Sequence, residues 1–373
     1  MERKGLSMTK PDTVAELLEA IRPDPREQAA REAAHRRRWA GVAKPLGSLG
    51  LLEPALEDIA ALTLSEEIDL SNRALLLLCA DNGVVAQGVA QSDHTVTAAV
   101  TRNAALHRSS VCRMAQVAGC RVVPVDMGVI DMPPMDNLLD RRLGNGTGDI
   151  TQGPAMSRRQ AEQAVLTGAQ LVREQKERSA GLLATGEMGI GNTTTSSAVA
   201  CVLLGRPAAE LTGRGSGLSD EGLRRKIRAI ETALAVNRPD PSDPLDVLAK
   251  VGGFDIAGLC GIFLGGALYR VPVLMDGLIS TVAALCALRL CRDAGKAMLA
   301  SHVSAEPAGR VLLDALDKKP LITAEMRLGE GTGAVAAMPL LDMALALYRD
   351  GATFESTGIE AYRPQEDCVC LPL

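Results

Sequence analysis

Aromatic residues and basic segments are scarce in this sequence. Phe, Trp and Tyr together make up 2% of the 373 residues, so Leu, Val, Ala, Ile and Met must fill the core. The formal net charge is −5, and no block of Lys and Arg stands out. This balance argues against nucleic acid as the main partner, because binding a polyanion requires concentrated positive charge. A phosphate group would have to be bound locally, by backbone amides and a few cations.

Long apolar runs are also scarce. Residues 1–30 are charged and contain no apolar stretch, which predicts that there is no secretory signal peptide. The most apolar segment, 257–275, is interrupted by Tyr269 and Arg270 and is shorter than the ~20 clean residues of a membrane span. We therefore expect a cytoplasmic protein with no membrane partner, in which this segment forms a buried helix and a strand.

Metal-binding patterns are missing as well. The nine cysteines are scattered, mostly through apolar stretches, which predicts buried, reduced thiols. Cys368 and Cys370 form a close pair that could bind a metal or act in redox chemistry, but no second Cys or His pair lies nearby. Because HExxH, DxD and CxxC patterns are also lacking, we expect neither a catalytic metal nor a cofactor.

An order of apolar run, polar loop and helix recurs along the chain. The run 74–80 ends in a polar turn, DNG, and predicts a strand that is buried on both faces. Further strands are predicted over 121–125, 182–184 and 271–274, and helices over 13–21, 31–39, 95–115 and 194–204 and from Leu51. This order predicts an α/β fold with a mostly parallel sheet flanked by helices. Ligands of such folds bind beyond the carboxyl ends of the strands, so the loops there are where chemistry is expected.

The first such loop is residues 186–195, GEMGIGNTTT, between a predicted strand and a helix. Small residues let the backbone approach a phosphate, and free amides at a helix start can bind it. The segment is neither a Walker A loop nor a full GxGxxG, so nucleoside triphosphates and dinucleotides are not indicated. An ordinary tight turn with a Thr cap is the alternative interpretation.

A second Gly-rich loop, residues 213–218 (GRGSGL), precedes a helix that carries Arg224, Arg225 and Lys226. Together the two loops could clasp one phosphate monoester. The alternative for the basic residues is a solvated helix face.

Two further segments carry titratable residues. In 327–334, RLGEGTGA, glycines flank Glu330, and a carboxylate on such a loop could act as a general base. A Glu in a turn is otherwise usually just exposed. In 301–306, SHVSAE, the order of Ser, His and Glu fits no nucleophile elbow, so we expect His302 to be a buried, hydrogen-bonded residue.

Taken together, these segments resemble the nicotinate-nucleotide:dimethylbenzimidazole phosphoribosyltransferase family of cobalamin synthesis. The resemblance runs from about Lys44 to Ser356 and includes KPLGSLG at 44–50, DNGV at 81–84 and GGFDI at 252–256, besides the four segments above. It implies an α/β fold with a smaller helical domain from the terminal regions, and a homodimer. We expect domain limits at 1–70, 71–345 and 346–373.

The resemblance also implies a reaction. An aromatic lower-ligand base attacks C1 of the ribose of nicotinate mononucleotide, displaces nicotinate and yields an α-ribotide. By resemblance Glu187 lies beside the ribose, Glu330 takes the proton from the nucleophile, and Lys226 is near the phosphate. The remaining phosphate- and ribose-binding residues are expected to be Gly189, Gly191, Asn192, Thr193, Gly215 and Ser216.

The acceptor side departs from the family's pattern. Members usually read Asp-His-Gly-Val and then Ser-Ala-Tyr-Pro-Gln-Glu-Val-Thr, whereas this chain has DNGV and then AQSDHTVT at 90–97. Ser92 therefore replaces the Tyr and His94 the Gln, and with Leu328 these residues are our predicted acceptor contacts. An imidazole can assist a phenolic nucleophile, so a phenol is a predicted alternative acceptor.

Three other interpretations stay open. His94 could simply point to solvent on a loop that has drifted. The chain could be a low-activity partner subunit of a paralogous pair, or a nucleotide-binding sensor, although two acidic residues in Gly-rich loops favour an enzyme.

Overall fold

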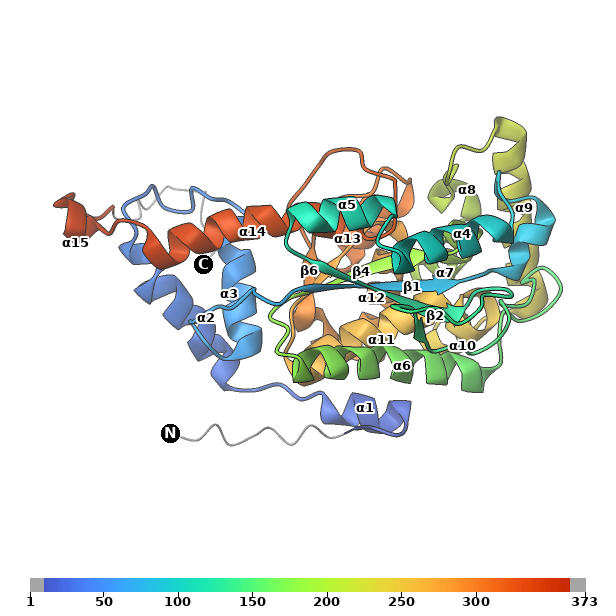
Figure 1. Cartoon of the computed structure of the whole chain (residues 1–373), viewed down its shortest axis with the longest axis horizontal. Coiled ribbons are helices and arrows are strands. Elements are labelled where there is room, and N and C mark those ends of the chain that lie inside the picture. The colour runs from blue at the N-terminus through green and yellow to red at the C-terminus, as the bar shows by residue number, and fades with distance from the viewer. Residues whose placement is uncertain (1–9, 363–373) are drawn as a thin grey trace.

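Six parallel strands form one sheet in the order β3-β2-β1-β4-β5-β6 (Figure 1). The computed structural model describes residues 10–362. The strands are β1 (Ala74–Ala80), β2 (Arg121–Gly128), β3 (Leu139–Asp140), β4 (Leu183–Met188), β5 (Val273–Met275) and β6 (Met298–Ala300). All seven residues of β1 are buried, as an unbroken apolar run between two neighbours requires. The predicted α/β fold is confirmed.

Alternate side chains of β1 enter two separate cores. Leu76 and Leu78 pack under one face with residues of α6 (Arg158–Glu177), α10 (Pro244–Val251), α11 (Phe254–Tyr269) and α12 (Leu278–Leu290). Leu75 and Leu77 pack on the other face with residues of α3 (Leu52–Thr63), α4 (His94–Ala105), α5 (Ser110–Val117) and α14 (Thr332–Asp350). The sheet is therefore the middle layer of three (Figure 1).

Helices α6 and α11 approach so closely that only glycine fits between them. A Cβ on Gly168 would lie 1.9 Å from the carbonyl oxygen of Gly258, and one on Gly261 would lie 1.9 Å from that of Val165. The apolar segment 257–275 forms most of α11 and β5, which confirms the predicted buried helix and strand. Within residues 10–362, none of the helices has the length and apolar character to cross a membrane.

Segments from both terminal regions meet at one end of the molecule (Figure 1). Trp39 packs edge-on against Tyr348 of α14 with 5.1 Å between ring centroids, and Lys44 pairs with Glu53 of α3 at 2.6 Å. The helices of this end are α2 (Arg26–Arg37), η1 (Trp39–Gly41), α3, the last turns of α14, and α15 (Phe354–Thr357).

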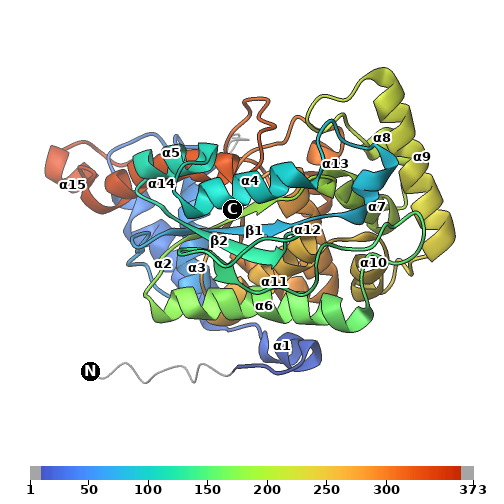
Figure 2. The same cartoon turned by 45° about the vertical axis from the view of Figure 1, so that its right-hand side comes forward.

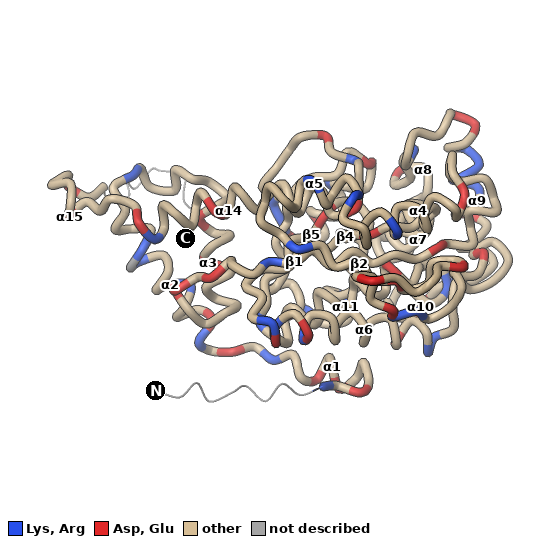
Figure 3. The backbone as a smooth tube through the Cα atoms, in the orientation of Figure 1, with Lys and Arg blue, Asp and Glu red and all other residues tan. Residues whose placement is uncertain are grey.

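The opposite end is formed by helices on either side of the second Gly-rich loop in the sequence (Figure 2). It contains α8 (Ala208–Leu211) and α9 (Asp220–Asn237), beside α7 (Asn192–Leu204). The remaining elements are α1 (Val14–Ala20), η2 (Gly83–Gln87), η3 (Arg292–Ala297) and α13 (Ala308–Ala315). Lys and Arg are interspersed with Asp and Glu along the described chain (Figure 3).

Three local predictions were wrong. The helix expected over 95–115 is two helices, α4 and α5, because the chain turns at His107, whose φ is +57°. Strand β4 extends to Met188, so Glu187 lies on the strand end and not in the loop. Strands β3 and β6 were not predicted, because two or three residues carry no readable alternation.

Candidate active site

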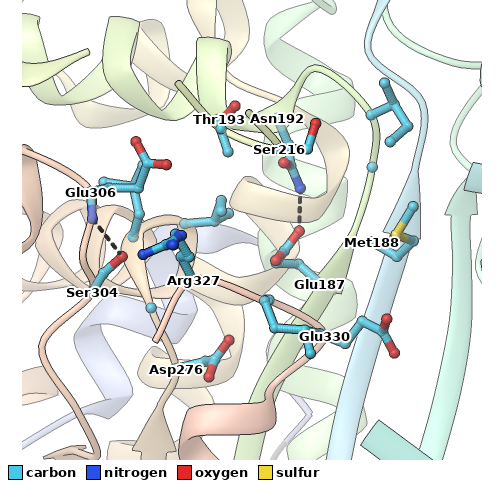
Figure 4. Close-up of a pocket in the computed structure, with 18 of the residues that line it drawn as sticks. Glu187, Met188, Asn192, Thr193, Ser216, Asp276, Ser304, Glu306, Arg327 and Glu330 are labelled. Atoms are coloured by element: carbon cyan, nitrogen blue, oxygen red, sulfur yellow. Dashed lines mark hydrogen bonds between the residues drawn. The ribbon is translucent and has the colours of Figure 1, made fainter. Parts of the chain in front are cut away.

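A cavity of about 270 Å³ opens at the carboxyl ends of the strands. Its walls come from the segments after β1, β4, β5 and β6, from the second Gly-rich loop and from the turn before α14. Nine of the predicted site residues line it: Glu187, Gly189, Gly191, Asn192, Thr193, Gly215, Ser216, Leu328 and Glu330. Six segments far apart in the sequence thus converge on one space, at the edge of the sheet where chemistry was expected. Figure 4 shows several of the residues that they contribute.

The first Gly-rich loop turns sharply from β4 into α7. Gly191 has a φ of +94°, and a Cβ on Gly189 would lie 2.3 Å from the carbonyl oxygen of Ala80, so both positions require glycine. No side chain caps the N-terminus of α7. The N–H groups of Asn192 and Thr194 are bonded within the turn, to the carbonyl groups of Gly189 and Gly191. The N-terminus of α7 still lies at the cavity wall, where its partial positive charge favours an anion.

Lys226 joins the two Gly-rich loops from behind the cavity wall. Its side chain is fully buried, and Nζ donates to Oγ1 of Thr193 at 2.8 Å. A Cβ on Gly215 would lie 3.5 Å from Nζ, so the second loop also passes close to the amine. Burial lowers the pKa of Lys226 to about 8, although the nearby Glu306 partly opposes that shift. Arg224 is exposed, as expected for a solvated helix face.

The two predicted catalytic glutamates line the same cavity from different elements. In Figure 4 the carboxylate of Glu187 points toward Asn192, whereas that of Glu330 points away from it; its Oε2 accepts from the backbone N–H of Val111 at 3.4 Å. Glu330 has a φ of +58° between Gly329 at +85° and Gly331 at +86°, a run of left-handed backbone that turns the chain into α14. A Cβ on Gly329 would lie 2.8 Å from Oε1 of Glu187. The turn that carries Glu330 therefore passes directly over the carboxylate of Glu187.

Asp276 fixes that turn. Its Oδ2 accepts from the backbone N–H of Gly331 at 3.1 Å, and its Oδ1 accepts from those of Gly333 and Ala334 at 2.8 and 3.2 Å. Asp276 directly follows β5 and is buried. A carboxylate thus satisfies three donors at the start of α14 and sets the position of Glu330.

Asn192 bridges two buried carboxyl groups. Its Nδ2 donates to Oε2 of Glu187 in a short contact and to Oδ2 of Asp255 at 3.0 Å. Burial, followed by the charge of Asp255, raises the pKa of Glu187 to about 8. Burial also raises the pKa of Asp255 to about 6, against the lowering effect of Asn192.

Two predicted acceptor residues do not line the cavity. His94 is exposed at the start of α4, and Ser92 is half-buried on the preceding turn, whereas Val89 and Ala90 from the same segment do line it. His302 is buried, and its Nδ1 lies 3.1 Å from Oγ of Ser301, as predicted. Cys368 and Cys370 lie outside the described residues.

Sequence reasoning missed Asp255, Asp276 and Arg327. Asp276 could have been found from its position directly after a predicted strand. Asp255 carries no such signal, because it lies 63 residues from Asn192 and only the fold brings the two together. Among residues 10–362, no group of three or more His, Cys, Asp or Glu side chains is arranged to hold a metal ion.

Comparison with known proteins identifies the fold and the family. A family model described as phosphoribosyltransferase matches residues 23–359. A protein from Ruminiclostridium cellulolyticum named nicotinate-nucleotide–dimethylbenzimidazole phosphoribosyltransferase is 45% identical over 330 residues, which cover 88% of this chain and 94% of that protein. One of the same name from Roseiflexus is 45% identical over 336 residues, covering 90% and 95%.

Solved structures agree with these relatives. The crystal structure of CobT from Thermus thermophilus superposes with a TM-score of 0.84 at 39% sequence identity, covering 88% of this chain and 99% of that chain. The family predicted from the sequence is therefore confirmed. This chain is a phosphoribosyltransferase and belongs to the nicotinate-nucleotide–dimethylbenzimidazole phosphoribosyltransferase family.

Proposed function

We propose that this enzyme transfers the phosphoribosyl group of nicotinate mononucleotide to an aromatic lower-ligand base, releasing nicotinate and forming an α-ribotide. One observation carries the proposal: Glu187 and Glu330 line a single cavity whose opposite wall holds two Gly-rich loops tied together by a buried lysine. A donor with one phosphate and one reacting sugar carbon fits this arrangement: the phosphate would lie at the loops and the lysine, and the sugar carbon at the two carboxylates.

The phosphate would bind between the loops at Thr193, Gly215 and Ser216. The N-terminus of α7 would favour the phosphate through its partial positive charge, and the buried Lys226 would supply a full positive charge. Lys226 has little other compensation for its burial, since Thr193 is its hydrogen-bond partner and Glu306 the nearby charge that favours its protonated form. A phosphate would provide that compensation.

The ribose would lie over Glu187. Departure of nicotinate leaves positive charge on C1 and the ring oxygen, and an ionised carboxylate in a water-poor cavity stabilises such charge. Glu330, on the turn that passes over Glu187, would accept the proton of the attacking base. Attack on the face opposite the departing nicotinate inverts C1 and gives the α-linkage.

The acceptor is proposed to be a benzimidazole. Leu328 is 56% exposed on the cavity wall and offers an apolar surface for an aromatic ring. A phenolic acceptor stays a prediction; its motivating residue, His94, is exposed and lies outside the cavity wall. The proposed assembly is a homodimer, with a paralogous partner as the alternative.

The test is the initial rate of nicotinate release from nicotinate mononucleotide by the purified chain, with and without 5,6-dimethylbenzimidazole. We expect release that depends on the acceptor. Release only after addition of a paralogous chain would favour the partner-subunit alternative, and no release in either case would contradict the proposed reaction.

A further inference from the structure

The carboxyl groups of Glu187 and Asp255 share a single side-chain donor. The two N–H bonds on Nδ2 of Asn192 are divided between them, one to each. Asp255 is fully buried, and its other oxygen, Oδ1, has no side-chain or other hydrogen-bond partner at hydrogen-bonding geometry within residues 10–362. Two carboxylates that flank one neutral amide in a buried site are under-compensated if both are ionised.

The side chains around the pair add mainly negative charge, although the backbone N–H groups of Asp255 and Ile256 at the start of α11 act to lower the pKa of Asp255. Four acidic groups face it from three other elements: Cys79 and Asp81 at the end of β1, Asp276 after β5, and Glu330 before α14. The thiol of Cys79 is neutral, because burial raises its pKa to about 12. The basic groups on the same cavity are His302 after β6, Arg327, and Arg214, which pairs with Asp220. Lys226 lies behind Thr193. Figure 4 shows Arg327 directed toward Ser304 and Glu306, on the far side from Glu187.

We infer that Glu187 and Asp255 hold one proton between them across Asn192, and that this proton leaves when a donor with a cationic base binds over Glu187. The O–H bond of the carboxyl breaks, its electron pair stays on the carboxylate, and the proton passes through the cavity to solvent. The raised pKa values of both groups agree with this arrangement. The inference rests on the proposed function, because it takes as donor nicotinate mononucleotide, whose ring nitrogen next to the ribose is cationic.

The consequence is a donor site that is neutralised when empty and charged when filled. Without the proton, the site would carry buried, unpaired negative charge before any ligand arrived. With it, a ribotide that carries a cationic pyridinium ring binds in exchange for a proton, whereas a sugar phosphate without a cationic ring gains nothing from the exchange. The pair would therefore select for a donor whose leaving group is positively charged.

Calorimetric titration of the full-length protein tests this directly. Nicotinate mononucleotide is titrated at pH 7 in several buffers of different ionisation enthalpy, and the slope gives the protons released per ligand bound. Ribose 5-phosphate is the matched ligand, because it carries the same phosphate and sugar and reports any proton exchange at Lys226 or at the phosphate. We expect nicotinate mononucleotide to release about one proton more than ribose 5-phosphate at pH 7, and the excess to disappear by about pH 9, above the free-site pKa of Glu187.

Two variants assign the proton. Glu187→Gln should abolish the excess release. Asp255→Asn keeps Glu187, and the new amide can accept the hydrogen bond from Asn192 through its oxygen. Because a like charge next to Glu187 is lost, we expect the pH midpoint of the excess proton release to fall by roughly one unit. Asp126→Asn is the control, because Asp126 is also a buried acid at the strand ends but pairs with Arg142 and does not line the cavity; it should leave the midpoint unchanged.

The outcomes separate this inference from the proposed function. If nicotinate mononucleotide does not bind, the proposed donor is wrong and the inference falls with it. If it binds with the same proton count as ribose 5-phosphate, the proposed function stands and the shared proton is refuted. An unshifted midpoint in Asp255→Asn would equally refute the role of Asp255.

Discussion

Replacing Lys226 with Met should raise the stability of the ligand-free protein above that of the wild type. It should also remove most of the stabilisation that the bound donor gives. Lys226 is fully buried, and burial lowers its pKa from 10.5 to about 8. A shift of that size corresponds to a destabilisation of about 3 kcal/mol while the amine is charged and folded. Methionine has a similar length and no charge, so it removes this penalty.

The net gain is smaller because one hydrogen bond is lost. Removing the bond from Nζ to Oγ1 of Thr193 costs about 1 kcal/mol. The variant should therefore have a free energy of unfolding higher by about 2 kcal/mol at pH 7. The sign follows from linkage: the folded pKa is depressed, so the penalty is complete below about pH 8 and is relieved as pH rises toward 10.5. The advantage of the variant should vanish over that window.

Urea denaturation at pH 7 and pH 10, with and without nicotinate mononucleotide, measures the stability of the free variant and the stabilisation by the donor. At about 100 times its Kd, the donor should stabilise the wild type by about 2.7 kcal/mol and the variant hardly at all. Lys319→Met is the control, because Lys319 is exposed and distant from the cavity; it should change neither quantity. A Lys226→Met protein that is less stable than the wild type at pH 7, or that is still stabilised by the donor, would refute the reasoning.

Three further changes test other parts of the site. Glu330→Gln should lower kcat by about 10²–10⁴-fold with unchanged donor affinity, and kinetics within threefold of the wild type would exclude a general base there. Asp276→Asn removes the charge that accepts three N–H groups of the turn, so unfolding should need about 2 kcal/mol less and kcat should fall; equal stability in urea would show that the turn is held otherwise. His94→Ala should leave the rate with dimethylbenzimidazole unchanged, and a loss of ribotide formation specific to phenol would restore His94 as an acceptor contact. Because the pyridinium of the proposed donor is already a good leaving group and the donor carries no pyrophosphate, chelation by EDTA should leave the rate unaltered, which a timed assay checks.

Sequence patterns predicted the sheet where strands are long and apolar. β1 has seven buried residues in a row, so its position and burial on both faces could be read directly. β6 has three residues, and its place at the sheet edge is set by pairing with β5, which is a tertiary contact. The break between α4 and α5 was missed because its left-handed residue is His107 and not a glycine.

The candidate site could be predicted where its backbone geometry requires glycine, because glycine can be read from the sequence. Both Gly-rich loops and the turn at Glu330 have positive φ angles that glycine supplies or flanks, and all three lie at the cavity. Asp255 was missed because its function depends on a hydrogen bond to Asn192 that spans 63 residues. The phenolic prediction rested on sequence position alone, and position could not show that His94 is exposed.

Product analysis tests the central claim most directly. The purified chain is incubated with nicotinate mononucleotide and 5,6-dimethylbenzimidazole, and nicotinate and ribotide are quantified together by chromatography, with the anomer assigned by proton NMR. We predict one nicotinate for each α-ribotide formed, and neither product from Glu330→Gln above trace levels. Nicotinate released without ribotide, or a β-anomer as the main product, would contradict the account.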